Sequence, residues 1–600
     1  MQVQDTARRF WLIVAAFLVI WWVYQAFWGA PNLISWDVYG YYVYLPATLI
    51  YGDPFSYGFV DAHFANYAVS TNLYQLAEVR DGLMAPIYTI GMAILWLPFF
   101  LVAHVFALVL PGIPADGLSQ PYQLAILAAA LSYTALGFWY LHQFLSRYFN
   151  KAVVYWCLGV LFFGTNLWHY TLFEAGMSHA YLFGLYAILL EFTARWHERP
   201  SRYHTTVIGV VIALLCLCRP SEGIALLIPL LYGITSRQTL VEKWKLVWDN
   251  RSQVVLLAVV GLLTISPQII YWQATIGEWV YNGYQGHHFD WLEPHLWEGL
   301  FSYRKGWLVY TPVMALSIVG FAFLYRQQRP WFLPVLSFFL INLYIVLSWH
   351  IWWYAGSFGM RALVQSYAVL SIPLACLLAY FLQGNQAFKV VVPLVLLLFI
   401  GLNQFQNWQF RNRILLNDEM TKTYYWNAWG KTQFEPEAYT YVDIDERFPA
   451  AVPAASTLLA QLVAGTDCPN DTTLAGKVAE QLIPGKEFSC TIQYPIREAE
   501  AVALSKQWVN VAIDVFLAAE DFDRFRQARL VLSVDRAGEG VHYQALRLQR
   551  NRPLSTWIEV AYQTQLPTLQ AGDHLKMYVW NTSPDPLYLH RLRLEHWQAD

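Results

Sequence analysis

Charged residues are scarce in this sequence of 600 residues. They make up 13% of the chain, against about 25% in a typical soluble protein. The formal net charge of −3 leaves no basic excess to neutralise a phosphate backbone, which excludes a nucleic-acid-binding protein. Six cysteines are too few for a small disulfide-built scaffold, and an apolar content of 57% excludes a disordered chain.

The scarcity of charge is confined to the first two thirds of the chain. Residues 1–400 contain 36 charged residues, whereas the 200 residues after them contain 43. This contrast predicts an integral membrane protein that carries a soluble C-terminal domain. Sequence motifs of nucleotide and zinc-ribbon sites, such as GxGxxG, GxxxxGK[ST] and paired CxxC, do not occur in the chain.

Apolar segments that approach the ~20 residues of a spanning helix are numerous in the first part. Arg8 and Arg9 precede the first of them, whose apolar run is too long for a signal peptide and is not followed by a small-residue cleavage site. We therefore expect an uncleaved anchor. In total we expect about 11 spans, near 10–29, 121–145, 153–171, 180–196, 204–219, 222–235, 253–273, 307–325, 331–349, 362–382 and 389–406.

The distribution of basic residues predicts the orientation of these spans. Residues 85–110 are apolar enough to cross, but if they lie along the outer surface, fourteen basic residues fall inside and five outside. The inner set is Arg8, Arg9, Arg147, Lys151, Arg195, Arg199, Arg202, Arg237, Lys243, Lys245, Arg251, Arg326, Arg329 and Lys389, and the outer set is Arg80, Arg219, Arg304, Lys305 and Arg361. A second arrangement, with the N-terminus outside and 12 spans, places 13 basic residues inside and 6 outside, and it stays open. Both arrangements place the tail outside.

The C-terminal tail predicts a β-sandwich. In Trp508–Phe516 the apolar residues alternate, as in a half-buried strand, and similar runs occupy 529–535, 541–549, 556–563, 575–580 and 586–596. Short strands at this spacing are typical of an antiparallel sandwich. We expect a membrane domain over 1–407 with a large external loop at 30–120, a connector over 408–485 with a short helix at 452–463, and the sandwich over 486–600.

Acidic residues near span ends are candidates for function, because ionisable groups at membrane depth are costly. Asp37 follows the first span in SWDVYGYYVYLPA, where a carboxylate can act as a general base toward an acceptor hydroxyl or amine. The alternative is a helix N-cap, for which Asp is favoured. Glu174 and His179 lie in FEAGMSHAY, a tight external connection, and either form an acid–base pair or stabilise the loop.

Four external basic residues are candidates for binding a phosphate. Arg304 and Lys305 form an adjacent pair that opens a span at the level of lipid headgroups, Arg361 follows in WWYAGSFGMRAL, and Arg219 lies in CRPSEG between two short spans. Arg suits bidentate phosphate contacts and Lys suits point-charge contacts. The alternative for these residues is simple anchoring at the membrane interface.

Aromatic and histidine side chains in the same external segments are candidates for substrate binding. Trp353 and Tyr354 either stack on a sugar or belong to the aromatic belt of the membrane. The loop 274–306 carries histidines and carboxylates that can ligate a divalent metal ion, although their spacing matches no strong metal motif. These residues are His287, His288, Asp290, Glu293 and His295. Cys468 and Cys490 both lie in the external tail, where a disulfide can form.

Taken in order, these features resemble a known family. An external Asp37 follows the first span, Pro86 and Tyr88 open an apolar helix in the first loop, Arg219–Pro220 break two short spans, and a soluble tail ends the chain. The pattern resembles the GT-C superfamily of polytopic glycosyltransferases. It is most similar to the branch of protein O-mannosyltransferases and lipid A aminoarabinose transferases, whose bacterial members are grouped as family 39. The resemblance covers residues 10–410.

The resemblance implies an inverting glycosyltransferase in the bacterial inner membrane. The donor would be a polyprenyl-phosphate sugar on the periplasmic face, and the acceptor a lipid, a glycan or a protein. Asp37 would be the general base and Glu174 a second acid, with residues 85–110 as a juxtamembrane helix. Arg304, Lys305 and Arg361 would bind the donor phosphate, and the tail would be a carbohydrate-binding-like sandwich.

Two other functions stay open. Many family members carry an acidic pair at the first site, whereas Val38 follows Asp37 here, so a non-catalytic membrane scaffold or partner subunit is one alternative. A transporter of lipid-linked sugars is the other, and it needs polar residues inside the spans to line a path. His142, Glu191 and Gln268 lie near predicted span ends and do not form such a path.

Overall fold

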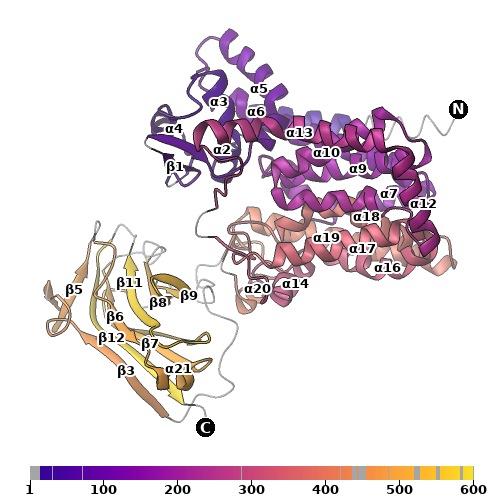
Figure 1. Ribbon diagram of the computed structural model, residues 1–600. Coiled ribbons are helices and arrows are strands. Elements are labelled where there is room, and N and C mark those ends of the chain that lie inside the picture. The colour runs from indigo at the N-terminus through magenta and orange to yellow at the C-terminus, as the bar shows by residue number, and fades with distance from the viewer. Residues whose placement is uncertain are drawn as a thin grey trace. The chain divides into compact units, whose positions relative to one another are not determined.

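The computed structural model describes two compact units, residues 1–407 and 408–600. Figure 1 shows the first unit as a helical bundle and the second as a domain of strands. The residues that the structure describes are 14–29, 31–70, 72–80, 82–284, 287–418, 420–434, 442, 455–469, 471–483, 486–518, 528–548, 554–581 and 585–598. Arg8 and Arg9, which contribute to the predicted orientation, lie outside them.

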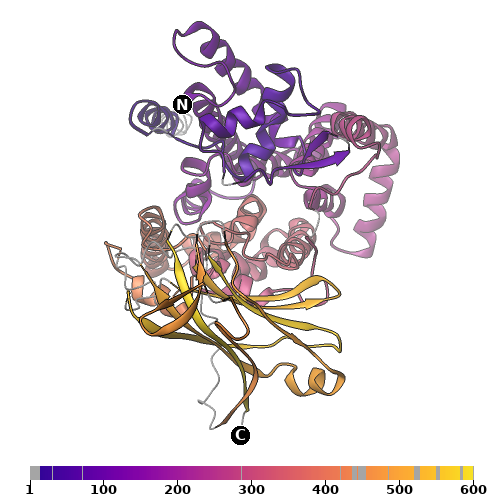
Figure 2. The same ribbon diagram turned by 90° about the vertical axis from the view of Figure 1, so that its left-hand side faces the viewer.

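The helical unit is built from long apolar helices joined by short segments. Its main helices are α5 (Gly91–Val109), α6 (Gln120–Leu145), α7 (Lys151–Phe163), α8 (Leu167–Leu172), α9 (His179–Glu198), α10 (Arg202–Cys218), α11 (Leu227–Leu231), α12 (Arg237–Asp249), α13 (Arg251–Thr275), α16 (Ala315–Gln327), α17 (Arg329–Leu347), α18 (Tyr367–Leu382) and α19 (Gln386–Arg411). Short 3₁₀ helices precede several of them: η2 (Pro220–Leu226), η3 (Pro312–Met314) and η4 (Arg361–Ser366). Figure 2, which looks nearly along the long helices, shows them packed side by side.

Within the described residues, six helices are long and apolar enough to cross a membrane: Gly91–Val109, Gln120–Leu145, Arg251–Thr275, Arg329–Leu347, Arg361–Leu382 and Gln386–Arg411. Shorter apolar helices cover Val14–Gly29, Lys151–Phe163, Arg202–Cys218, Pro220–Leu231 and Pro312–Gln327. The expected span at 153–171 is interrupted at 164–166, between α7 and α8. These helices support a membrane protein, while the count of 11 spans remains a prediction.

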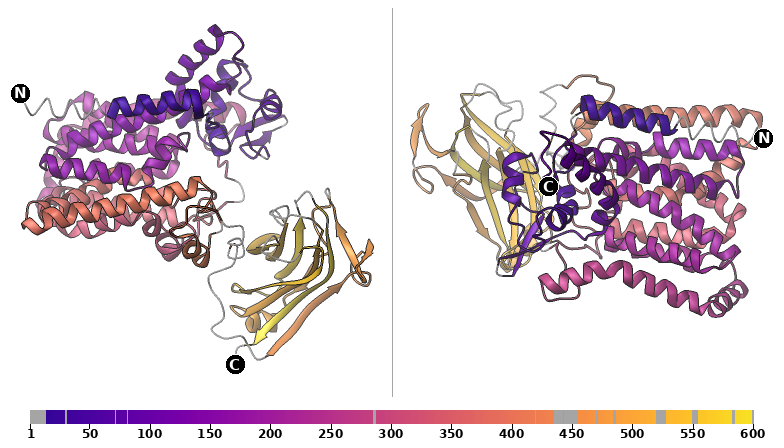
Figure 3. Two further views of the ribbon diagram at one scale, coloured as in Figure 1. Left: turned by 180° about the vertical axis from the view of Figure 1, so that it is seen from behind. Right: turned by 90° about the horizontal axis from the view of Figure 1, so that it is seen from above.

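The helix α5 differs from the others in its direction. Figures 1 and 3 show it angled away from the bundle, at the end that carries α2 (Asp37–Tyr42), α3 (Tyr44–Leu49) and α4 (Val60–Asn66). The far half of α5 exposes apolar side chains such as Val105 and Leu108. This position suits a helix that lies along the membrane surface, as we expect for residues 85–110.

The core of the bundle is formed by α9 and α18, which are buried on all sides over most of their length. Figure 3 shows the helix Val14–Gly29 and α19 along the outside. Two glycines allow α6 to approach α9: a Cβ at Gly137 would lie 2.7 Å from the Cα of Gly184. Small residues at such crossings are typical of membrane helix packing.

A compact segment of short helices and a hairpin covers one end of the bundle. It contains α2, α3 and α4, followed by an antiparallel hairpin of β1 (Leu76–Arg80) and β2 (Leu83–Pro86). The tyrosines of α2 and α3 are buried, and Tyr42 donates a hydrogen bond of 2.5 Å to the backbone oxygen of Gly117. The later segment between α13 and α16 contains α14 (Leu296–Phe301) and α15 (Trp307–Tyr310). Figure 1 shows α12 at the opposite end of the bundle.

The C-terminal unit is a two-sheet sandwich preceded by α20 (Lys422–Ala428). One sheet has the order β10-β7-β12-β5-β4, with β3 also paired to β12, and the other has the order β6-β11-β8-β9. The elements are β3 (Ala455–Val463), β4 (Thr472–Leu474), β5 (Lys477–Leu482), β6 (Ile492–Pro495), α21 (Glu498–Leu504), β7 (Trp508–Leu517), β8 (Ala528–Arg536), β9 (Glu539–Arg547), β10 (Trp557–Gln565), β11 (His574–Asn581) and β12 (Leu587–Gln598). The six strands expected from β7 onward are confirmed.

Three expectations for this unit are corrected. The predicted helix at 452–463 is the strand β3 over the part that the structure describes, because its backbone pairs with β12. The sandwich therefore begins before residue 486, since β3, β4 and β5 belong to it. The strand β7 is buried on both faces, not on one. Its polar face is covered by partners such as Arg591, whose Nη2 lies 2.9 Å from Asp514 Oδ2.

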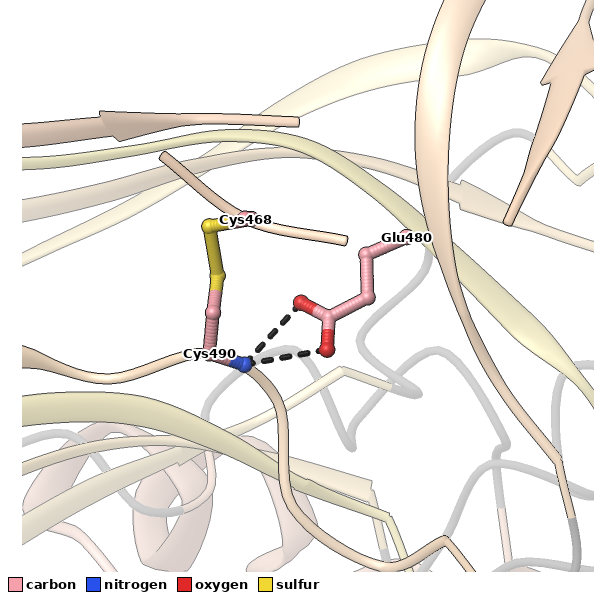
Figure 4. Close-up of side chains that lie close together, drawn as sticks. All are labelled: Cys468, Glu480 and Cys490. Atoms are coloured by element: carbon pink, nitrogen blue, oxygen red, sulfur yellow. Dashed lines mark hydrogen bonds between the residues drawn. A yellow bond between two sulfur atoms is a disulfide. The ribbon is translucent and has the colours of Figure 1, made fainter. Parts of the chain in front are cut away.

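A disulfide joins Cys468 to Cys490, 22 positions later in the chain. Figure 4 shows Glu480 beside it, with both carboxylate oxygens accepting from the backbone nitrogen of Cys490, at 3.1 and 3.0 Å. The Nζ of Lys486 lies 3.1 Å from the same carboxylate. The disulfide therefore fixes the segment that leads into β6 to the turn that follows β3, and the Glu480 carboxylate holds this segment beside β5.

We expect the double substitution Cys468→Ser and Cys490→Ser to destabilise the C-terminal unit by about 3 kcal/mol, because the open chain regains loop entropy on unfolding. Calorimetry of the full chain should show a lower unfolding temperature for this unit alone. Reduction of the unsubstituted protein should give the same shift, as the matched control. An unchanged transition after both treatments would contradict a stabilising role.

Candidate functional site

Asp37 is held at the first position of α2 by side chains, not by a capping bond. No side-chain capping bond exists at this helix start, and the preceding Trp36 has the left-handed φ of 51°. One oxygen of Asp37 accepts hydrogen bonds from Tyr74 OH at 2.7 Å and Tyr88 OH at 2.9 Å. The other accepts from Nη2 of Arg361 at 3.1 Å. The N-cap alternative is therefore wrong for Asp37.

The Asp37 carboxylate remains charged in this setting. Burial raises its pKa, but the positive charge of Arg361 and the hydrogen bonds from Tyr74 and Tyr88 outweigh burial, so the pKa lies below its usual value. The Asp37 side chain is still 24% exposed. In this structure the site therefore contains a charged carboxylate that is partly exposed and is paired with an arginine.

Glu174 belongs to the same charged group as Asp37. Its Oε1 lies 3.1 Å from Nε2 of His169. Burial raises the pKa of Glu174, whereas His169, Arg361 and Lys305 lower it, and the net pKa is below its usual value. Lys305 is only 1% exposed, and its Nζ donates a 2.5 Å hydrogen bond to the backbone oxygen of Ser357. Two carboxylates and two cations therefore lie within electrostatic reach of one another.

The expected pairing of Glu174 with His179 is not formed. The Nδ1 of His179 lies 3.3 Å from Oε1 of Gln365 instead. Gln365 also donates to Glu222 at 2.8 Å, and Glu222 accepts from Tyr186 at 2.5 Å. These four side chains are buried in the bundle. Two features of the sequence point to this second polar group: Glu222 follows Arg219 closely, and Gln365 interrupts an apolar run.

Arg219 lies between the two polar groups. Its guanidinium carbon is 5.8 Å from the centre of the Tyr354 ring. Its Nη1 is buried and has no hydrogen-bond partner among the residues that the structure describes. Burial, Tyr284 and Asp37 raise the pKa of Tyr41, while Arg219 and Arg361 lower it, so Arg219 and Asp37 act on one side chain. A guanidinium with one buried and unpaired nitrogen is suited to an anionic ligand.

Arg304 forms an arginine–aromatic stack next to this group. Its guanidinium carbon is 3.9 Å from the centre of the Trp353 ring, which is well within cation–π range. Trp353 therefore has a specific partner beyond a role in the aromatic belt. Tyr354 and Ala355, which follow it, have left-handed φ values of 55° and 53°. Such conformations are costly for residues other than glycine and cluster at functional sites.

The possible metal ligands of the histidine loop are paired with one another and with a neighbouring histidine. His287 Nδ1 lies 3.2 Å from Nε2 of His350, a residue that sequence analysis missed. His288 and His295 contact the two oxygens of Asp290 at 3.2 and 3.3 Å. Their ligand atoms do not converge on one point. Over the described chain, three possible metal ligands come within 4.8 Å only at Cys468, Glu480 and Cys490 (Figure 4), where the disulfide blocks both sulfurs.

The structure therefore brings together Asp37, Glu174, Arg361, Lys305 and Arg219 at the end of the bundle that carries α2. His287, His288 and Asp290 form a more exposed cluster, held against His350. Sequence analysis missed the donors Tyr74 and His169, for which no sequence signal exists. Tyr88 was noted only as part of the resemblance.

No family model matches the chain, and no curated protein matches it. Among solved structures, the chain is similar to the arabinosyltransferase EmbB from Mycobacterium smegmatis, with a TM-score of 0.30 and 10% sequence identity. The match covers 79% of this chain and 58% of that protein. The chain thus spans less than two thirds of EmbB. A likeness this weak carries no argument about activity, so the case for a function depends on the geometry of the site.

We predict that Tyr88→Phe raises the pKa of Asp37, because the Tyr88 hydroxyl donates to the charged carboxylate and a hydrogen bond to a charged group contributes ~1.5–3 kcal/mol. Since the folded-state pKa lies below the unfolded one, Asp37 stabilises the fold at neutral pH and loses this effect as pH falls. In the variant the loss should begin at higher pH. Acid unfolding followed by tryptophan fluorescence measures the shift.

The matched control is Tyr203→Phe, which alters an exposed tyrosine of α10 far along the bundle. This variant should unfold at the same pH as the unsubstituted protein. Equal acid midpoints for Tyr88→Phe and Tyr203→Phe would show that the Tyr88 hydroxyl does not hold the Asp37 charge.

Proposed function

We propose that the chain is a membrane glycosyltransferase that moves a sugar from a polyprenyl-phosphate donor to a hydroxyl or amine of a lipid, glycan or protein acceptor. The observation that carries this proposal is the Asp37–Arg361 ion pair, with Lys305 and Glu174 in the same electrostatic group. It supplies a base and positive charge in one place. We further propose that this face is the periplasmic face of the bacterial inner membrane.

The chemistry of the transfer matches this distribution of charge. The acceptor oxygen or nitrogen bonds to the anomeric carbon and its proton goes to the Asp37 carboxylate, while the carbon–oxygen bond to the phosphate breaks and the phosphate keeps the electron pair. This single displacement inverts the anomeric centre. Fixed cations stabilise the negative charge that develops on the leaving phosphate. We assign this role to Arg361, Lys305 and Arg219, with Arg304, stacked on Trp353, as a further candidate.

The ion pair also suggests how the base becomes active. A carboxylate held by an arginine and two phenols is a weak base. An incoming donor phosphate competes for the Arg361 guanidinium, since arginine binds phosphate and carboxylate in the same bidentate manner. Once Arg361 turns to the phosphate, the pKa of Asp37 rises toward the range of a useful base. The donor thereby activates the site that uses it.

Glu174 and the aromatic residues have supporting roles in this proposal. Glu174 balances the charge of Arg361 and Lys305, because unopposed cations would repel each other before the donor binds. Trp353 and Tyr354 present ring faces next to Arg304 and Arg219, a composition suited to a sugar ring. His179, through Gln365, fixes the buried layer beneath the site. His287, His288 and Asp290 belong to an outer loop that can contact the acceptor.

We expect Asp37→Asn to reduce turnover by about 10²–10⁴-fold, the usual contribution of general-base catalysis. Donor binding should be retained and become tighter, because a neutral side chain no longer competes with the donor phosphate for Arg361. Arg361→Ala should instead weaken donor binding, because it removes a phosphate contact. The measurement is transfer from a polyprenyl-phosphate sugar, with donor binding titrated separately on each variant. Asp61→Asn, an exposed external carboxylate on α4, is the matched control and should behave as the unsubstituted protein.

Full transfer by Asp37→Asn would contradict the base assignment. Donor binding without transfer by the unsubstituted protein, together with movement of the lipid-linked sugar across the bilayer, would favour the transporter alternative. A protein that neither binds nor transfers the donor would favour a non-catalytic subunit.

A further inference from the structure

The helix α12 lies at the end of the bundle opposite to α2 and exposes its apolar face, with the Arg251 guanidinium 5.8 Å from the ring centre of Trp248. No residue of this 13-residue helix is buried. Val241, Trp244 and Trp248 are each about two thirds exposed, at 68%, 67% and 68%. Their spacing of three, four and seven puts them on one helical face. Exposed tryptophans on one face are typical of a helix that lies in the membrane interface.

The other side of α12 is fastened to the bundle. The Nζ of Lys243 donates to the backbone oxygens of Pro229, at 2.7 Å, and Tyr232, at 3.2 Å. It also contacts His197 of α9. Lys243 is therefore satisfied by the protein, and the tryptophan face is turned away from these contacts. Figure 1 shows α12 running across the ends of the long helices, as an interfacial helix does.

A cavity of about 380 Å³ opens where α12 begins. Its walls combine Leu240, Phe332 and Tyr325 with two arginines, Arg237 and Arg329. All residues that line it are described by the structure, and none of them is acidic. The nearest acid of α12, Glu242, lies outside the lining and accepts from Gln238 at 3.0 Å.

The two arginines are available to a ligand. Both are exposed. Arg329 makes one long contact, 3.4 Å from Nη2 to the backbone oxygen of Thr235, and its guanidinium lies 5.2 Å from the ring centre of Tyr325. Neither contact neutralises its charge. The positive end of the α12 dipole adds to the field in the cavity. Such a site is complementary to a phosphate with an apolar tail.

We propose that this cavity binds an anionic phospholipid of the leaflet at the α12 end. Its headgroup phosphate would lie between Arg237 and Arg329, and an acyl chain would run along Leu240 and Phe332. The site is separate from the donor site in place and in role. It would fix the loop between α11 and α13 to the membrane surface whether or not the protein transfers a sugar.

Native mass spectrometry of the full chain in neutral detergent tests the proposal, with dioleoyl phosphatidylglycerol as the probe. Basic residues near anionic lipid contribute about 1 kcal/mol each, or about fivefold in affinity. Arg237→Gln and Arg329→Gln should therefore each weaken the tightest lipid-binding event about fivefold, and the pair about 25-fold. Arg237→Lys keeps the charge and should stay within about twofold.

The matched control is Arg326→Gln, an exposed arginine at the end of α16 that does not line the cavity. If Arg326→Gln and Arg329→Gln weakened lipid affinity equally, the proposal of a defined site would be overturned. Unchanged lipid affinity in the double variant of Arg237 and Arg329 would also overturn it. Dioleoyl phosphatidylcholine should not compete, because it carries no net charge. If millimolar inorganic phosphate displaced the lipid, the proposal that a lipid occupies the cavity would be overturned, and the site would be assigned to a free phosphate.

Discussion

One ion pair holds the candidate site together. Arg361 donates to Asp37 across 324 positions of sequence and joins the segment that contains α2 to the entrance of α18. Both side chains are largely withdrawn from water, with 12% and 24% of their surfaces exposed. A buried charge that loses its partner costs about 3–5 kcal/mol. The position of each residue therefore depends on the other, and the geometry of the site depends on both.

The segment that leads into Arg361 transmits this constraint to the rest of the bundle. Tyr170 OH donates to the backbone oxygen of Phe358 at 3.2 Å and accepts from its nitrogen at 3.0 Å. Ser357 accepts from Lys305. These contacts tie the segment to α8 and to the start of α15, so Arg361 is placed by rigid packing. A preorganised arginine loses little entropy when it binds a phosphate, which favours this residue for that role.

Sequence patterns predicted the types of secondary structure better than they predicted the contacts between distant residues. Low charge and long apolar runs predict a helical membrane region, and alternation predicts β7 and the strands after it. The predictions that the structure corrected share one cause, which is pairing between segments that are distant in the sequence. The strand β3 exists because β12 lies beside it, and no local pattern in ASTLLAQLV specifies that neighbour. Likewise, Asp37 and Arg361 were both selected, but their contact and the donors Tyr74 and His169 require the folded bundle.

The central claim is that a donor phosphate competes with Asp37 for Arg361. It is tested most directly by the pKa of Asp37, measured by carbon-13 NMR of labelled aspartate in the presence and absence of a short-chain polyprenyl phosphate, with Asp37→Asn to assign the signal. Competition predicts a low pKa of Asp37 without the lipid and a clear rise when the lipid binds. An Asp37 pKa that does not change at saturating lipid would contradict it.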